Sequence, residues 1–326
     1  MNSFTRLILP LMSALTLGSA AAADVAAYPT RPIRFVVPFP GGGSYDVVAR
    51  LLGSGLAERL GQQIVVDNRP GAGGLIGTEV FINAPSDGYT IGMFGNPQTI
   101  AATLNPHFKW NLSSDITPIA TLASLTNVVV INPTVPAKSM KQLIQLAKEK
   151  PGSLNYASGG IGATSHLAGE LLKHKAGIDL VHVPYKGAAT ALTDLMSGRV
   201  QLMVLNMVVA MPQIRSGKLR ALAVASPQRS AFLPDVESAT EAGLPGFEFN
   251  QWYSVVGPKG MPPSIVHTLY RHIDAVRRSK TFSDGLMKQG AEPFLADQKT
   301  FAAYIREDVD KYRRLVKDSG IVASSK

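Results

Sequence analysis

The chain has 326 residues, no cysteine and a formal net charge of +9, because 32 lysines and arginines outnumber 23 aspartates and glutamates. A chain of this length can form two domains with ample cores, and the lack of cysteine excludes disulfides as a source of stability. The basic residues are scattered, and the densest groups, at residues 277–278 and 311–314, lie in helix-like segments with acidic neighbours. This distribution excludes a nucleic-acid interface, whereas the positive field suits a protein that binds small anions.

The first 23 residues have the pattern of a secretory signal peptide. A segment that contains Arg6 precedes an apolar run at residues 7–17, and residues 19–23 are all small. The apolar run is shorter than the roughly 20 residues that span a bilayer, so we expect cleavage near Ala21 or Ala23. A frayed N-terminal helix is the alternative. Because a lipid anchor needs a cysteine directly after the signal, we expect the exported chain to be free in the periplasm, with no lipid anchor.

After the signal, short apolar runs alternate with amphipathic segments. Residues 46–60 carry apolar side chains at helical spacing and end at Gly61, and Ser139 with Gln142 predicts a capping box at the start of another helix. The tail at residues 263–320 is almost entirely helical in pattern. The predicted strands are residues 33–37, 63–66, 89–94, 127–131, 154–157, 179–183, 201–205 and 219–225. This alternation predicts an α/β fold with mostly parallel sheets flanked by helices.

No flexible linker divides the chain, although its length favours two domains. A boundary without a linker indicates lobes that are joined by crossing strands, with hinges near residues 125–132 and 247–256.

Two glycine-rich turns lie between a predicted strand and a predicted helix, at residues 38–46 (PFPGGGSYD) and 156–166 (YASGGIGATSH). Glycines let the backbone approach a ligand, and the start of a helix offers unpaired N–H donors and a partial positive charge. The hydroxyls of Ser44, Ser158, Thr164 and Ser165 add donors that suit a carboxylate. Tight turns that bind nothing are the alternative for each loop alone.

Other chemistries fit these segments poorly. The first loop lacks the Lys-Ser/Thr ending of a P-loop, and Asp46 stands where a dinucleotide fingerprint needs its third glycine. Ser158 is not in a nucleophile elbow. His166, Glu170 and His174 share a helix face, but a single helix cannot complete a metal site, and we expect neither metal nor cofactor.

Five further motifs resemble those of one known family. They are residues 65–74 (VVDNRPGAGG), 87–90 (DGYT), 185–187 (YKG), 214–223 (IRSGKLRALA) and 241–246 (EAGLPG). Together they are similar to the Bug/TctC-type periplasmic receptors of tripartite tricarboxylate transporters, and the resemblance runs from about Tyr28 to Ile321.

The resemblance implies a two-lobed type II periplasmic-binding-protein fold that closes over its ligand. It places domain 1 at residues 24–127 plus 252–326 and domain 2 at residues 128–251. It also implies a small carboxylate ligand, separate membrane permease subunits as partners, and a monomer with no catalytic residue. Carried over to this sequence, the ligand-binding residues are Phe39, Gly42, Gly43, Ser44, Tyr45, Asp46, Asn96, Ser158, Gly162, Ala163, Thr164, Ser165, His166 and Asn206.

Three positions depart from the family pattern. Gly41 stands where the family commonly has proline, Tyr45 where it has threonine or serine, and Leu205 where it often has aspartate. An added aromatic ring and a lost carboxylate make the pocket less polar, so we expect a ligand with an aromatic or otherwise weakly polar body. The alternative is that Tyr45 points to solvent and has no bearing on the ligand.

Two other function classes stay open at this point. A ligand-presenting partner of a membrane sensor kinase has the same fold. A periplasmic hydrolase is the third class, although the sequence shows no catalytic triad, metal set or cofactor motif.

Overall fold

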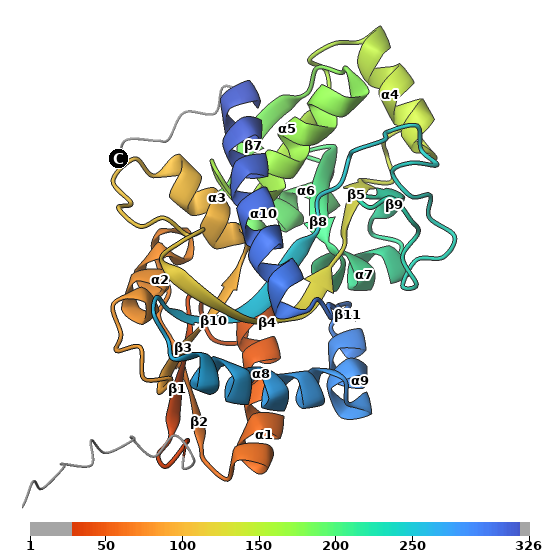
Figure 1. Ribbon diagram of the computed structural model, residues 1–326. Coiled ribbons are helices and arrows are strands. Elements are labelled where there is room, and N and C mark those ends of the chain that lie inside the picture. Colours follow the sequence, from red (N-terminus) through yellow and green to blue (C-terminus); the bar gives the residue numbers. More distant parts are fainter. Residues whose placement is uncertain (1–27, 320–326) are drawn as a thin grey trace, which may run out of the picture.

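The computed structural model describes residues 28–319, so the predicted signal peptide lies outside the described residues. The chain forms two mixed β-sheets with helices packed around each of them (Figure 1). The six-stranded sheet has the spatial order β11 (Glu292–Pro293), β4 (Ile116–Leu125), β10 (Gln251–Pro258), β3 (Thr90–Gly95), β1 (Ile33–Val37) and β2 (Ile64–Asn68). The five-stranded sheet has the order β7 (Val181–Pro184), β6 (Asn155–Ser158), β8 (Leu202–Asn206), β5 (Asn127–Ile131) and β9 (Arg220–Val224).

Both sheets are mixed: four strand pairs are parallel and five are antiparallel across the described residues, because one central strand of each sheet runs opposite to its neighbours. β1 pairs in parallel with β2 and β3, and β6 pairs in parallel with β7 and β8. β10 lies antiparallel between β3 and β4, and β5 lies antiparallel between β8 and β9. The short β11 extends the first sheet by an antiparallel pairing with β4.

Helices connect and cover the strands of both sheets. Those that follow strands of the six-stranded sheet are α1 (Ser44–Leu60), the 3₁₀ turn η2 (Ala72–Gly74), α2 (Leu75–Ile82), α3 (Asn96–Leu104), α8 (Pro263–Arg277), α9 (Lys280–Lys288) and α10 (Gln298–Ser319). Those of the five-stranded sheet are α4 (Met140–Glu149), α5 (Thr164–Ala176), α6 (Ala188–Met196) and α7 (Met207–Arg215). Across residues 28–319, no helix combines the length and apolar character that a membrane crossing requires.

Local sequence explains where α1 begins and ends. Gly43 is in an extended conformation at the N-cap, and Gly61 adopts the left-handed conformation that stops the helix, with its N–H bonded to Ala57 O at 3.0 Å. Val48 and Leu56 lie on the face that packs against the sheet, and both are buried. The end at Gly61 agrees with the prediction.

Every strand predicted from the sequence overlaps an observed strand, with differences of one or two residues at some ends. Three strands, β4, β10 and the two-residue β11, were not predicted. Pro118 lies within β4, where proline cannot donate to the ladder, and the pairing with β10 shifts its register next to this residue. A proline in a run of this kind hides the strand from sequence patterns.

The polypeptide moves from one sheet to the other in two places. It leaves the six-stranded sheet at the end of β4 and enters β5 two residues later, and it returns at the start of β10. Helix α10 then runs alongside both parts (Figure 1): Phe301 packs with residues of the first sheet, whereas Tyr312 packs in the core around the second. The residue-level domain boundaries at 127/128 and 251/252 stay a prediction.

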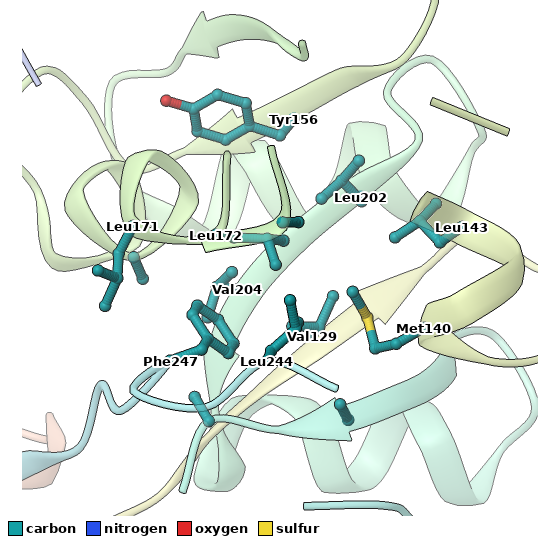
Figure 2. Packing of buried hydrophobic residues seen from close by; sticks show 14 of the residues in the cluster. Val129, Met140, Leu143, Tyr156, Leu171, Leu172, Leu202, Val204, Leu244 and Phe247 are labelled. Carbon is teal, nitrogen blue, oxygen red and sulfur yellow. The ribbon is translucent and has the colours of Figure 1, made fainter. Parts of the chain in front are cut away.

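The core of the five-stranded sheet is closed by α4, α5 and the segment after β9. Figure 2 shows Leu172 of α5 and Val204 of β8 pointing into this core, with Phe247 packed against them. Tyr156 lies at its edge, on the strand that leads into the second glycine-rich loop. This packing supports the base of that loop.

Candidate functional site

A cavity of about 520 Å³ lies where the two sheets meet. It is lined by Phe39, Pro40, Gly41, Gly42, Gly43, Ser44, Tyr45, Pro97, Thr164, Asn206, Gln251 and Tyr253. Phe39 to Gly43 form the loop between β1 and α1, and the other residues come from the starts of helices and of β10. None of these lining residues is charged.

Several helices begin at this cavity. Ser44 and Thr164 are the first residues of α1 and α5, Pro97 lies in the first turn of α3, and Asn206 is the N-cap of α7. A helix N-terminus carries roughly half a positive charge and unpaired N–H groups. We therefore expect these helix starts to favour an anion in the cavity, although no lysine or arginine lines it.

An aromatic wall forms one side of the cavity. The rings of Phe39 and Tyr45 have centroids 4.4 Å apart, and those of Tyr45 and Tyr253 are 4.2 Å apart. Tyr45 is 4% exposed, and its hydroxyl donates to Gln98 Oε1 at 3.0 Å. The alternative that Tyr45 points to solvent is wrong, because its ring is packed between two other rings.

A pair of hydroxyl groups lies next to this wall. Ser44 Oγ and Tyr253 Oη are 2.8 Å apart, and either atom can be the donor. Burial raises the pKa of the Tyr253 phenol, so this hydroxyl stays neutral at physiological pH.

Asp46, which was assigned to the ligand, instead holds the first loop together. Its Oδ2 accepts hydrogen bonds from Gly42 N and from Arg50 Nε, both at 2.9 Å. The hydrogen bond from Arg50 lowers the pKa of this carboxyl group. Asn68 donates from Nδ2 to Phe39 O at 3.0 Å and fixes the loop from its other end. The carboxylate of Asp46 does not line the cavity, since it is turned toward its own loop and helix.

Asn96 is also not a cavity residue. It is fully buried and donates from Nδ2 to Asn250 O at 3.0 Å and to Tyr312 Oη at 2.8 Å. Its Oδ1 accepts from Trp252 N at 3.3 Å. Its side chain thus joins the start of α3 to β10 and α10, and both N–H groups of the side-chain amide are already used.

Side chains that were predicted to bind the ligand instead form hydrogen bonds within the second glycine-rich loop. Ser158 is fully buried, and its hydroxyl lies 2.6 Å from His182 Nε2 and donates to Gly160 O at 3.0 Å. Ser165 Oγ accepts from Gly159 N at 3.0 Å. These side chains therefore shape the loop and do not line the cavity.

His166 belongs to the same internal network. Its Nδ1 accepts from Gly162 N at 3.0 Å, and its ring stacks on His182 with centroids 3.9 Å apart and planes 6° apart. Burial lowers the pKa of His166, and burial together with His166 lowers the pKa of His182 to about 4. Both imidazoles are neutral at pH 7. Gly162, which has a positive φ of 77°, and Ala163, the N-cap of α5, lie in this loop but outside the cavity.

The predicted and observed cavity residues overlap in part. Seven of the fourteen residues expected to bind the ligand line this cavity, and their contact with a ligand stays a prediction: Phe39, Gly42, Gly43, Ser44, Tyr45, Thr164 and Asn206. The predicted set lacked Pro40, Gly41 and Pro97, which neighbour predicted residues, and it lacked Gln251 and Tyr253, which belong to β10, a strand that no motif marked. The polar pair Asn250-Gln251 between Phe249 and Trp252, inside the segment predicted as a hinge, was a weak signal.

On the helix face that was considered for a metal, His166 and Glu170 have other partners. Glu170 Oε1 accepts from Tyr156 Oη at 2.5 Å and from Lys173 Nζ at 3.1 Å. Within the part of the chain that the structure describes, no group of three or more His, Cys, Asp or Glu residues is arranged to hold a metal ion.

Comparison of the whole chain with known proteins identifies its family. Residues 48–321 match the model of the tripartite tricarboxylate transporter family receptor. Protein BugT of Bordetella pertussis is 36% identical over 307 residues, which cover 94% of each chain. The chain therefore belongs to this receptor family, which is a family of solute-binding proteins and not of enzymes.

Solved structures agree on the fold. The structure of R. palustris Rpa4515 with adipate is 33% identical with a TM-score of 0.80, and the match covers 90% of this chain and 99% of that one. The periplasmic binding protein BugD is also 33% identical, with a TM-score of 0.77 and the same coverage. The prediction of a two-lobed α/β periplasmic-binding-protein fold is confirmed.

Proposed function

We propose that this chain is a periplasmic receptor that captures a small organic carboxylate in the cavity between its two sheets. One observation carries the proposal: the N-termini of α1, α3, α5 and α7 meet at a cavity whose lining has no charged side chain. Backbone N–H groups at helix starts bind anions well, and a cationic side chain is not needed. The adipate in the related Rpa4515 structure is a ligand of this chemical class.

The cavity wall supports a ligand with an apolar body. Phe39, Tyr45 and Tyr253 offer ring faces, and Pro40 and Pro97 add apolar surface. Leu205 lies in β8 and does not line the cavity, so the apolar character of the pocket comes from these rings and prolines and not from the carboxylate that Leu205 replaces. We therefore expect an aromatic monocarboxylate or dicarboxylate, or an aliphatic acid of similar polarity.

In this proposal the receptor passes its ligand to separate permease subunits in the membrane. Closure of the two lobes distinguishes loaded from empty receptor, because the bound anion stabilises the closed state differentially. The export that the N-terminal sequence predicts and the periplasmic character of BugD support this location. Uptake of a labelled acid by cells that lack the chain tests the transport step.

A thermal-shift screen tests ligand capture directly. Citrate, malate, adipate, benzoate and terephthalate are each added to protein that has been unfolded, stripped of ligand and refolded. An acid at about 100 times its dissociation constant stabilises the protein by roughly 2.7 kcal/mol and raises its melting temperature. The shift should be strongest for the less polar acids.

Two variants locate the effect. In Thr164→Val the cavity loses a hydroxyl, and the shift at the same acid concentration should become clearly smaller, because a hydrogen bond to a charged group contributes about 1.5–3 kcal/mol. Thr193→Val changes an exposed threonine of α6 outside the cavity and should leave the shift intact. Equal stabilisation of both variants by an acid would place the site elsewhere, and the lack of any shift in the wild type would refute carboxylate capture.

A further inference from the structure

A chain of hydrogen bonds connects both sheets at the cavity. Asn206 Oδ1 accepts from Val209 N at 3.1 Å, Asn206 Nδ2 donates to Gln251 Oε1 at 3.4 Å, and Gln251 Nε2 donates to Thr164 Oγ1 at 3.3 Å. Asn206, Gln251 and Thr164 all line the cavity. The last two bonds are long but lie within the range of hydrogen bonds.

The donor and acceptor of each hydrogen bond in this series follow from the first bond, which joins Val209 N to Asn206 Oδ1. Val209 N is a backbone N–H at the start of α7 and can only donate, so it needs the oxygen of the Asn206 amide. The amide nitrogen of Asn206 must then face Gln251 and pair with the oxygen of that amide. This leaves the Gln251 nitrogen as the donor to Thr164.

This direction determines what the hydroxyl group of Thr164 can offer to a ligand. Its oxygen already accepts a hydrogen bond from Gln251, so its own proton is available to a ligand atom that can accept. Gln251 is 9% exposed, and its backbone is fixed by pairing with Leu125 of β4. The donor is therefore held in place by a strand of the six-stranded sheet, although Thr164 belongs to α5.

The hydroxyl pair next to the aromatic wall behaves differently. Ser44 and Tyr253 are bonded to each other, and either can donate. This pair can therefore present a proton or a lone pair to a ligand. In the cavity the Thr164 hydroxyl is thus presented to a ligand as a donor, whereas the Ser44–Tyr253 pair can either donate or accept.

We propose that Gln251 determines specificity by fixing Thr164 as a donor to an ionised acid, while Ser44 and Tyr253 accept a second polar group of either kind. This inference rests on the proposed function, because it names how the same cavity chooses a carboxylate. It adds a residue outside both glycine-rich loops.

The variant Gln251→Glu tests this direction. The carboxylate of Glu can only accept, so the Thr164 hydroxyl turns to donate to it and no longer serves the ligand. The negative charge alone also repels an acid, and a double-mutant cycle with Thr164→Val separates the two effects. Gln228→Glu, an exposed change outside the cavity, is the matched control for charge.

Isothermal titration with adipate and with benzoate is the measurement. We expect Gln251→Glu to weaken acid binding about tenfold more when Thr164 is present than in the Thr164→Val background, and Gln228→Glu to have no effect. Equal weakening in both backgrounds overturns the inference, because charge repulsion alone gives that result. If Gln251→Glu does not fold, Gln251→Met in the same cycle must show coupling with Thr164→Val, and its absence overturns the inference equally.

The two proposals fail in different ways. If neither acid binds the wild-type protein, carboxylate capture fails and the role of Gln251 fails with it. If an acid binds the wild type but the cycle shows no coupling, the proposed function stands and only the role of Gln251 falls.

Discussion

The stacked histidines beneath the second glycine-rich loop predict that the protein loses stability in mild acid. His182 lies between Tyr156 and His166, with ring centroids 4.8 and 3.9 Å away, and Ser158 contacts its Nε2. Two charged residues act on this pair: Glu170 raises the pKa of His166 and His182, and Lys173 lowers it. Burial outweighs the effect of Glu170, and the folded state therefore favours neutral imidazoles.

The sign and size of the effect follow from the pKa of His182. This pKa is lowered from 6.5 to about 4, so the unfolded chain binds the proton more tightly than the folded one. The stabilisation is fully present above pH 6.5 and is lost as the pH falls toward 4. A full shift of this size corresponds to about 3 kcal/mol, and we reduce it to about 2 kcal/mol because the side chain is only half-buried.

Melting temperatures of wild type and His182→Gln between pH 7 and 4.5 test this reasoning. The wild type should lose about 3 °C more than the variant over this interval, since an unfolding entropy of about 2.1 cal/mol/K per residue turns about 2 kcal/mol into about 3 °C in a chain of this length. His174→Gln, which changes an exposed histidine on α5, is the control and should follow the wild type. If the melting temperature of His182→Gln falls with pH as steeply as that of the wild type, protonation of His182 is not the cause of the acid destabilisation.

Three further changes separate cavity residues from structural ones. Tyr45→Ser removes a ring from the aromatic wall and should weaken benzoate binding about tenfold while changing malate binding less, as titration calorimetry of both acids will show. Asn96→Ala leaves several buried partners unpaired and should lower the free energy of unfolding by about 2–4 kcal/mol in urea. Arg50→Ala removes the hydrogen bond that lowers the pKa of Asp46, so this pKa should rise in an NMR titration and acid affinity should fall about threefold through a looser loop. An unchanged unfolding curve for Asn96→Ala, or unchanged benzoate affinity for Tyr45→Ser, would contradict these roles.

The sequence predicted most of the scaffold for simple physical reasons. Apolar runs such as residues 33–37 and 127–131 form strands where they were expected, and Gly61 ends α1 because its left-handed conformation costs glycine little. It missed β4, β10 and β11: Pro118 interrupts the first, the second was interpreted as a hinge, and the two-residue β11 lies in a tail with a helical pattern.

The site was predictable only in outline. Glycines and hydroxyl residues at the starts of helices marked the right loops, but sequence cannot show which way a polar side chain turns. Ser158 and His166 point into their own loop, where they accept hydrogen bonds from Gly160 N and Gly162 N. Gln251 comes from a strand far along the chain, and only the fold brings it to Thr164.

The central claim is that helix N-termini and hydroxyl donors, without a charged side chain, hold an anion in this cavity. The most direct test is to titrate the ligand-stripped protein with an acid and with its uncharged amide of the same shape, benzoate against benzamide and adipate against adipamide. The account predicts that at least one acid binds about a hundredfold more tightly than its amide, because donors aimed at a charged group contribute about 1.5–3 kcal/mol each. Equal affinity for acid and amide, or binding of the amides alone, would contradict it.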